Sequence, residues 1–389
     1  MIYFDNAATT RIDDRVFDAM LPYLKEQYGN PGALYGLGRE AKLAVARARE
    51  QAAELINCSP DQVIFTSGGS EANNLAFSIR QRWSCPIVTT KMEHDSVIEA
   101  AHSFEWMVND RLPVNSHGVV TPEGFADYID SFERYTGGNH IRTAAIMFVN
   151  NEIGSVTEVD KLAKICDEKG INLHVDCVQA LGSVPVNVRD IGCQSASFSS
   201  HKIHGPKGVG ALYVRNADGY DPLICGGADQ EFGLRGGTEN VAGIVGFGEA
   251  CRIVKENLAA NMEYVAKLRS EFLQILRSCL STNGLADIMH INGNLVNCVP
   301  KVLSLRFDGV DAQTLVLLAD MHGVCISAGS ACRAHDIKPS PALLAIGLTE
   351  EQARSTVRIS FSTYNTLAEI QEGARIIADC VSSLIWSEQ

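Results

Sequence analysis

Short apolar segments that alternate with helical patterns run from residue 38 to residue 214 and constrain the fold of this chain most strongly. The segments hold β-branched and aromatic residues, are too short for buried helices, and lie at 63–66, 86–89, 144–149, 171–176, 195–199 and 209–214. Helical spacing of apolar residues predicts helices at 38–56, from Glu71, at 94–104 and at 159–169. Such alternation is typical of an α/β protein whose mainly parallel sheet carries helices on both faces.

The pattern changes near residue 255. A long amphipathic helix is predicted at 257–278 without a strand beside it. The remaining predicted elements are strands at 302–307, 324–327 and 357–360, and helices at 312–321 and from Leu367. We therefore expect a large α/β domain formed by residues 16–255. Residues 1–15 and 256–389 would form a smaller α+β domain.

Composition narrows the class of protein. The chain has 389 residues, of which 46% are hydrophobic and 20% charged, which fits a globular protein with a large core and excludes general disorder. The net charge is −13 and no basic run stands out, which argues against nucleic-acid binding. No stretch of about 18 apolar residues predicts a membrane span, and the N-terminus lacks the pattern of a secretory signal. We expect a cytoplasmic enzyme that binds neither membrane nor nucleic acid.

The twelve cysteines are scattered and form no C-x-x-C pair, which argues against a zinc ribbon, a self-contained iron–sulfur site or another metal centre. We interpret them as free thiols in a reducing compartment. Cys332 differs from most of the others because it lies in the small, polar segment Ser327–His335. Arg333 and His335 would favour its thiolate form. The alternative is an incidental loop thiol.

Lys202 and Asp176 each end an apolar strand. A lysine at a strand end, followed by a turn of glycine and proline, is either a solvated loop residue or a Schiff-base lysine that is partly desolvated. An aspartate there is either a cap or a carboxylate that pairs with the pyridinium nitrogen of pyridoxal 5′-phosphate. Gln179 could donate to the ring hydroxyl. Because ligands gather at the carboxyl ends of parallel strands, Asp176 and Lys202 should lie at one edge.

A phosphate site is predicted where the strand at 63–66 meets the next helix. The segment Thr66–Glu71 provides a glycine turn and then free N–H groups at a helix N-terminus, and Ser70 adds a hydroxyl. Ser199, His201 and Thr238 are further donors of a suitable type. The alternative is a capped helix after a tight turn, since no established phosphate-loop motif is matched.

Two further residues could contact a substrate or a cofactor. His94 opens a predicted helix and could stack on a cofactor ring and move protons near neutral pH, or could be a cap or a core histidine. Arg358 is a charge inside an apolar, β-rich run, so it needs an anionic partner. That partner is either a substrate carboxylate or a structural salt bridge.

Taken together, these sequence strings resemble those of the cysteine desulfurases, and they occur in the same order along the chain. The cysteine desulfurases belong to the class V aminotransferase group of fold-type I pyridoxal-phosphate enzymes. The resemblance runs from Tyr3–Thr10 to the C-terminal strand and helix. Its most specific strings are Asn150–Gly154, His174–Asp176 with Gln179, Ser200–Lys202 with Gly205–Gly208, Arg235–Thr238 and Ser327–Cys332. It implies a large domain with a mainly parallel, seven-stranded sheet and a smaller α+β domain.

The resemblance also implies roles for individual residues. Lys202 would bind the cofactor covalently, Asp176 would pair with its pyridine nitrogen, and Cys332 would take sulfur from L-cysteine as a persulfide, leaving L-alanine. His94 would stack over the ring and act as acid and base. Further contacts to the cofactor would come from Gly69, Ser70, Asn151, Gln179, Ser199, His201 and Thr238, the last from a partner subunit, and contacts to the substrate from Asn6, Asn151 and Arg358.

The resemblance further implies a homodimer of the subtype that has a mobile cysteine loop. The sulfur acceptor would be a protein such as an iron–sulfur scaffold or a tRNA-thiolation enzyme. Two departures bear on partner contacts: Tyr35 stands where the family commonly has histidine, and Arg333 where small hydroxyl residues are usual. Alternatives are a selenocysteine lyase, another class V lyase or aminotransferase, or a non-enzymatic sulfur-carrier scaffold.

Overall fold

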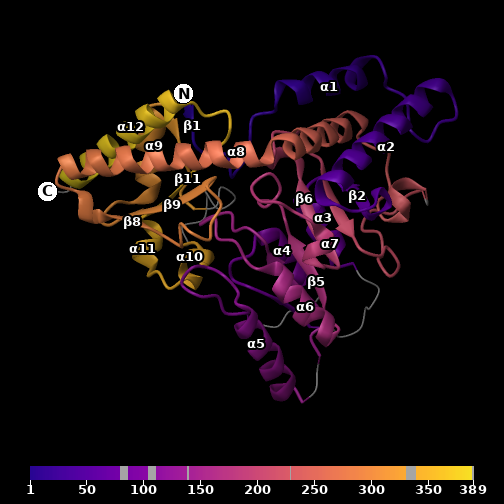
Figure 1. The fold of residues 1–389 in the computed structure, drawn as a ribbon, viewed down its shortest axis with the longest axis horizontal. Helices are drawn as coiled ribbons and strands as arrows, with labels where there is room; N and C mark the ends of the chain where they lie inside the picture. The colour runs from indigo at the N-terminus through magenta and orange to yellow at the C-terminus, as the bar shows by residue number, and fades with distance from the viewer. Residues whose placement is uncertain (79–85, 104–110, 138–139, 228, 330–338, 388–389) are drawn as a thin grey trace.

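A six-stranded sheet with helices on both faces forms the larger part of the structure (Figure 1). The computed structural model describes residues 1–78, 86–103, 111–137, 140–227, 229–329 and 339–387. The strands are β2 (Val63–Thr66), β3 (Ile87–Thr89), β4 (Thr143–Met147), β5 (Asn172–Asp176), β6 (Ser195–Ser199) and β7 (Gly210–Val214).

The sheet has the order β2-β7-β6-β5-β4-β3. Strands β3 to β6 are parallel to one another, and β7 is antiparallel to both of its neighbours. Consequently β2 runs in the same direction as β6, and the carboxyl ends of five strands lie at one edge. The predicted mainly parallel sheet is confirmed.

The described residues contribute six strands to this sheet, whereas the resemblance implied seven. At the β3 edge, Leu112 pairs with Thr90 in an isolated parallel bridge. A single bridged pair does not make a strand, and residues 104–110 before it lie outside the described part of the chain.

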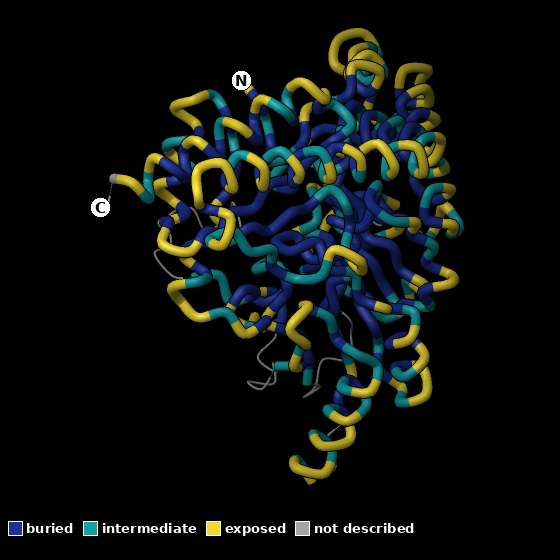
Figure 2. Tube along the Cα trace, turned by 60° about the vertical axis from the view of Figure 1, so that its left-hand side comes forward, coloured by how far each residue is buried: buried dark blue, intermediate teal, exposed yellow. Residues whose placement is uncertain are grey.

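Alternate residues of the strands enter different hydrophobic clusters, because successive side chains of a strand point to opposite faces. On β2, Val63 and Phe65 belong to a cluster that includes residues of six helices, whereas Ile64 packs with Leu75 of α3 (Gly69–Ala76). The six helices are α1 (Asp14–Lys25), α2 (Gly36–Ile56), α5 (Pro122–Tyr135), α6 (Val159–Lys169), α7 (Val188–Ile191) and α8 (Val241–Thr282). Helix α4 (Asp95–Ser103) packs beside α3. Figure 2 shows the strands buried at the centre.

Helix α8 begins at Val241, whereas the sequence predicted a start at Asn257. Glycines in its first turns weakened the helical signal, since glycine has a low helix propensity. They are needed for packing, because a Cβ on Gly248 would lie 2.5 Å from the Cα of Ala48 on α2. The first half of α8 packs in the cluster of the large sheet and its second half, from Val265 to Leu280, packs in a second cluster (Figure 1).

The second cluster lies in the part of the chain where the sequence predicted a smaller α+β domain. Strand β9 (Val302–Phe307) lies antiparallel between β8 (Met289–Ile291) and β11 (Thr356–Ser360), and β1 (Ile2–Tyr3) pairs in parallel with β10 (Val324–Cys325). The helices here are α9 (Ala312–Met321), α10 (Pro341–Ala345), α11 (Glu350–Arg354) and α12 (Leu367–Ser387). Phe4 packs edge-on against Phe272 and Phe361, with ring centroids 5.7 and 5.5 Å away.

These two clusters support the proposed division into residues 16–255 and residues 1–15 with 256–389, which stays a proposal. Its boundary falls inside α8, between Val254 of the first cluster and Val265 of the second. In the described residues, no helix is long and apolar enough to cross a membrane.

The segment after β1 connects the two clusters. Asp5 bridges to Ser360 of β11, and the N–H of Ala7 donates to the Ser360 hydroxyl at 2.8 Å. Farther along, the N–H of Thr10 donates to the carbonyl of His201 at 3.0 Å. The N-terminal segment therefore crosses the carboxyl edge of the large sheet.

Candidate active site

The carboxyl edge of the sheet borders a cavity of about 210 Å³. On the same measure one water molecule needs roughly 10–15 Å³, so a small organic molecule fits. The residues that line the cavity come from the segments that follow β2, β3, β4, β5 and β6 or from the ends of these strands, from the N-terminal segment and from β11. They are Ala7, Ala8, Gly69, Ser70, Asn73, His94, Ser96, Met147, Asn151, Asp176, Val178, Gln179, Ser199, His201, Lys202 and Arg358.

Lys202 lies in the 3₁₀ helix Ser200–Lys202 directly after β6. Its ammonium donates to the main-chain carbonyls of Ala7 and Ala8, each at 2.7 Å. The backbone beneath it is fixed by the bond from the Ser200 N–H to the Val209 carbonyl, at 3.1 Å. The lysine predicted to carry the cofactor thus stands where the N-terminal segment meets the sheet edge.

Asp176 ends β5 and is only 3% exposed. Its Oδ1 accepts from the N–H of Val178 at 2.9 Å, and its Oδ2 accepts from the Asn73 amide at 3.2 Å. These donors compensate a buried carboxylate in part, because each lies within hydrogen-bond distance.

His174 orients Asn73. The ring Nε2 lies 3.0 Å from Asn73 Oδ1 and Nδ1 lies 2.9 Å from the Ser195 hydroxyl. Burial lowers the pKa of His174 to about 3, so the ring is neutral. Because Asn73 donates through its amide nitrogen to Asp176, its oxygen must accept from His174 Nε2. Sequence reasoning missed Asn73, since only the fold brings α3 against β5.

The N-terminus of α3 supports the predicted phosphate site. A Cβ on Gly69 would lie 2.7 Å from Cγ2 of Val178, so only glycine fits there. Ser70, Ser199 and His201 lie in the same cavity wall. Burial, together with the nearby lysine charges, lowers the pKa of His201 to about 4, so this ring is a neutral donor or acceptor.

His94 and Gln179 complete the wall around Asp176 and Lys202. Nδ1 of His94 accepts from the N–H of Ser96 at 3.1 Å, which leaves Nε2 as the nitrogen that bears the proton in the neutral ring. The amide nitrogen of Gln179 donates to the Ala7 carbonyl at 2.8 Å, while its Oε1 is buried without a partner. A buried polar atom without a partner is costly and is expected where a ligand completes the site.

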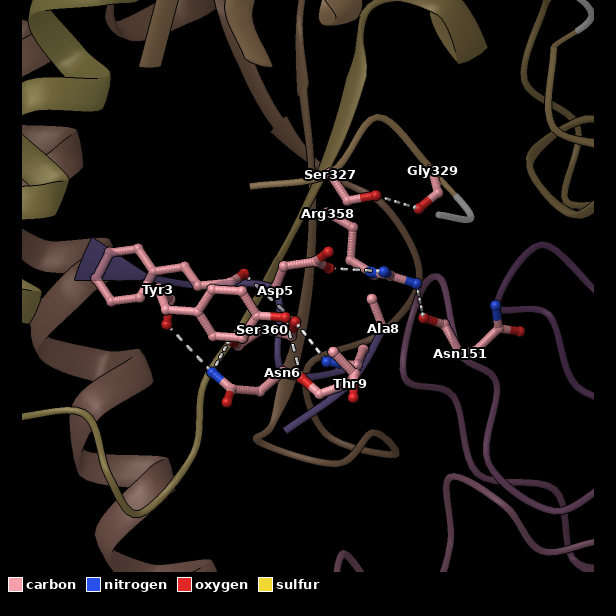
Figure 3. Close-up of polar contacts among 12 residues, drawn as sticks. Tyr3, Asp5, Asn6, Ala8, Thr9, Asn151, Ser327, Gly329, Arg358 and Ser360 are labelled. Carbon is pink, nitrogen blue, oxygen red and sulfur yellow. Dashed lines mark hydrogen bonds and ion pairs between the residues drawn. The ribbon is translucent and has the colours of Figure 1, made fainter. Parts of the chain in front are cut away.

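Arg358 of β11 also lines the cavity, and Figure 3 shows its contacts with Asp5 and Asn151. It is 2% exposed, and its guanidinium donates to the Asp5 carboxylate at 2.8 Å and to the main-chain carbonyl of Asn151 at 2.9 Å. Both partners lie on the guanidinium's outer nitrogens, and its Nε is buried without a partner. The structural salt bridge considered from sequence is therefore present, and the residue also lines the cavity.

Three predicted site residues do not line the cavity of the described chain. Asn6 directs its amide nitrogen toward the carbonyls of Tyr3 and Ser360, at 3.2 and 3.0 Å, and so supports the N-terminal segment (Figure 3). Thr238 is exposed, away from the cavity-lining residues. Cys332, with Arg333 and His335, lies outside the described residues.

The described ends of the segment that contains Cys332 are attached to the cavity wall. Ser327 pairs with Arg358 through two main-chain hydrogen bonds, and its hydroxyl donates to the Gly329 carbonyl at 3.0 Å (Figure 3). On the other side, the Ser340 hydroxyl donates to the Glu152 carboxylate at 2.6 Å.

Comparison with known proteins identifies the family of this chain. The family model described as aminotransferase class V matches residues 2–372. The chain belongs to the class V aminotransferase family. It is similar to cysteine desulfurase IscS of Dictyoglomus turgidum, with 36% identity over 98% of this chain and 95% of that protein.

Solved structures of other proteins resemble the chain over most of its length. A structure described as a NifS-like protein has a TM-score of 0.87 and 34% identity, and each chain is covered fully. A structure described as SspA in complex with cysteine has a TM-score of 0.77 and 29% identity, covering 94% of this chain and all of the other. The predicted fold-type I architecture is confirmed.

Glu93 is a buried acid beside this class V site that sequence reasoning missed. It is 7% exposed, its Oε1 accepts from the Thr90 hydroxyl at 2.8 Å, and its Oε2 is buried without a partner. Burial, with a smaller contribution from the charge of Asp176, raises the pKa of Glu93 to about 8. Met147 lines both the small cavity around Glu93 and the larger one.

The raised pKa of Glu93 predicts a pH-dependent stability. Between the ordinary pKa of 4.5 and the folded-state pKa of about 8, the folded protein holds a proton that the unfolded protein has lost. Wild-type stability should therefore fall as pH rises through this window, and Glu93→Gln should not show this loss. Thermal unfolding should give a stability advantage of Glu93→Gln that grows up to pH 8 and then levels. Glu99→Gln, at an exposed side chain on the same stretch, is the control, and an advantage independent of pH would contradict the assignment.

Proposed function

We propose that this chain is a cysteine desulfurase that uses pyridoxal 5′-phosphate, removes sulfur from L-cysteine, releases L-alanine and holds the sulfur as a persulfide on Cys332. One observation carries the proposal. One cavity at the carboxyl edge is lined by Lys202, Asp176 and His94, by the N-terminus of α3 and by Arg358. The similarity to cysteine desulfurases over nearly the full chain supports the same conclusion.

The residues present fit the cofactor. Gly69 at the α3 N-terminus carries no side chain and lines the cavity, so its backbone is open to a phosphate there, and Ser70, Ser199 and His201 supply donors around it. The carboxylate of Asp176 would pair with the pyridine nitrogen, and Gln179 would contact the ring oxygen. When bound, the cofactor supplies an electron sink for bonds at the substrate's α-carbon.

Each protein group then has a defined task. Lys202 would be the covalent attachment point and afterwards the amine that accepts and returns the proton at the substrate's α-carbon. His94, whose Nε2 bears the proton in the neutral ring, would stack on the cofactor and act as acid and base. Arg358 and Asn151 would bind the substrate carboxylate. The remaining hydrogens on the outer nitrogens of Arg358 and its unpartnered Nε allow this beside Asp5.

Cys332 would act as the nucleophile that takes the substrate sulfur. The thiolate of Cys332 would attack the substrate sulfur, so that a sulfur–sulfur bond forms as the carbon–sulfur bond breaks. The electron pair of the broken bond would stay on the substrate's carbon, which takes up a proton on the way to L-alanine. The sulfur would pass to a protein acceptor such as an iron–sulfur scaffold or a tRNA-thiolation enzyme. The free thiols at every described cysteine support a reducing, cytoplasmic setting.

Replacing the nucleophile separates desulfuration from cofactor binding. Cys332→Ala should lower alanine formation from L-cysteine by more than about a hundredfold, because no other group accepts the sulfur, while the visible absorption of the bound cofactor stays. Cys279→Ala, on α8, is the matched control with wild-type turnover. Undiminished alanine formation in Cys332→Ala would reject the assigned nucleophile. Activity retained only with selenocysteine would favour a selenocysteine lyase.

We further propose a homodimer formed by the large-sheet half of the chain. Exposed apolar side chains gather on α1 and on the turn before α2, with exposed fractions of 60% for Leu24, 75% for Tyr28 and 90% for Leu34. Phe232 is also exposed, and its ring centroid lies 5.0 Å from the Arg49 guanidinium of α2. Such exposed apolar surface marks a protein interface. Thr238, six residues after Phe232, would then reach the partner's phosphate site.

Disruption of this surface should give monomers and weaken cofactor binding, because Thr238 would be lost from the partner's site. Sedimentation should report twice the chain mass for the wild type and a lower mass for Leu24→Glu. Leu317→Glu, at an exposed position of α9 in the other half, should stay dimeric. A wild-type protein that sediments as a monomer would contradict the proposed interface.

A further inference from the structure

A second lysine lies directly behind Lys202. The ammonium of Lys301, in the turn before β9, donates to the main-chain carbonyl of Lys202 at 3.0 Å. Lys202 and Lys301 both line a second cavity, of about 60 Å³. Lys202 therefore stands between two cavities and has a second amine within its immediate surroundings.

No carboxylate in the described part of the chain forms an ion pair with Lys301. The charged neighbours that act on it are Lys202 and Arg358, both cations. Burial and these two charges lower the pKa of Lys301 to about 7. A cation in this position is costly, and its proton competes with a proton on the nitrogen of Lys202.

The other ionisable groups around the pair come from several elements. Asp176 ends β5, His94 precedes α4, and Arg358 on β11 is paired with Asp5. His201 and His204, on either side of Lys202, have pKa values lowered to about 4 by burial and, in part, by the charge of Lys301. Both rings are neutral near pH 7, so Lys301 is the titrating cation nearest to the backbone of Lys202.

We propose that Lys301 is a positioning residue that fixes the backbone of Lys202 and, by its charge, favours the proton-free form of the Lys202 nitrogen. This inference rests on the proposed function, in which Lys202 binds the cofactor and moves a proton. A lysine can act as nucleophile or base only without its proton, and a neighbouring cation promotes loss of that proton to solvent. The structure thereby assigns a role to a lysine that the sequence analysis did not single out.

Three substitutions separate the charge of Lys301 from its hydrogen bond. Lys301→Arg keeps a donor and a charge, Lys301→Gln keeps a donor without charge, and Lys301→Met has neither. The readout is the pH midpoint of the visible absorption change of the cofactor-loaded protein, which reports the proton on the Lys202 nitrogen. Lys207→Met is the matched control, because Lys207 is exposed and also acts on His201.

The pH midpoints of the variants should differ according to whether residue 301 carries a charge. Lys301→Gln and Lys301→Met should raise the pH midpoint by about one pH unit, as expected on removing a nearby like charge. Lys301→Arg should keep the midpoint at or below the wild-type value. Lys207→Met should leave it within a few tenths of a unit. A midpoint that is unchanged in both Lys301→Gln and Lys301→Met, or that moves only in Lys301→Met, would overturn the electrostatic role of Lys301.

Borohydride reduction of the same wild-type sample keeps the two proposals distinguishable. A pyridoxyl group on Lys202 together with an unmoved midpoint in the variants overturns the role of Lys301 alone. An unlabelled Lys202 in the wild type overturns both the proposed function and this inference. Loss of the visible absorption in Lys301→Met alone, with the expected midpoint in Lys301→Gln, supports the inference. It also shows that the hydrogen bond from residue 301 to the Lys202 carbonyl is needed for cofactor binding.

Discussion

The two hydrogen bonds from the Lys202 amine to the carbonyls of Ala7 and Ala8 join the two halves of the chain at the point where its chemistry is proposed to occur. Through them, a segment that begins in the second core crosses the carboxyl edge of the large sheet. The same segment carries Asp5, which holds Arg358 of β11. Residues of both halves therefore line the cavity, and a structural change in either half should alter the position of Lys202.

Buried polar groups around this junction are held in a fixed order. Neutral His174 orients Asn73, and Asn73 donates to Asp176, so that one carboxylate is positioned by side chains from α3 and β5. Glu93 and Lys301, just behind the cavity wall, have pKa values displaced toward their neutral forms by burial. Asp176 and Arg358 line the cavity itself.

Much of this arrangement could be predicted from local patterns. Short apolar strands that end at Asp176 and Ser199 place Asp176 and Lys202 at one edge of the sheet, because the carboxyl ends of parallel strands lie together. Three kinds of feature could not be predicted. Glycines hid the first half of α8, and the contacts of Asn73 and Lys301 depend on residues far apart in the sequence. The hydrogen bonds of Asn6 form only because the N-terminal segment lies beside Ser360 of β11.

The most direct test of the central claim is chemical trapping of the cofactor on the wild-type protein. The protein would be loaded with pyridoxal 5′-phosphate, reduced with borohydride, digested and mapped by mass spectrometry. The account predicts a single pyridoxyl group on Lys202, and its loss in Lys202→Ala. A label on any other lysine, Lys301 included, or a protein that takes up no label, would contradict it.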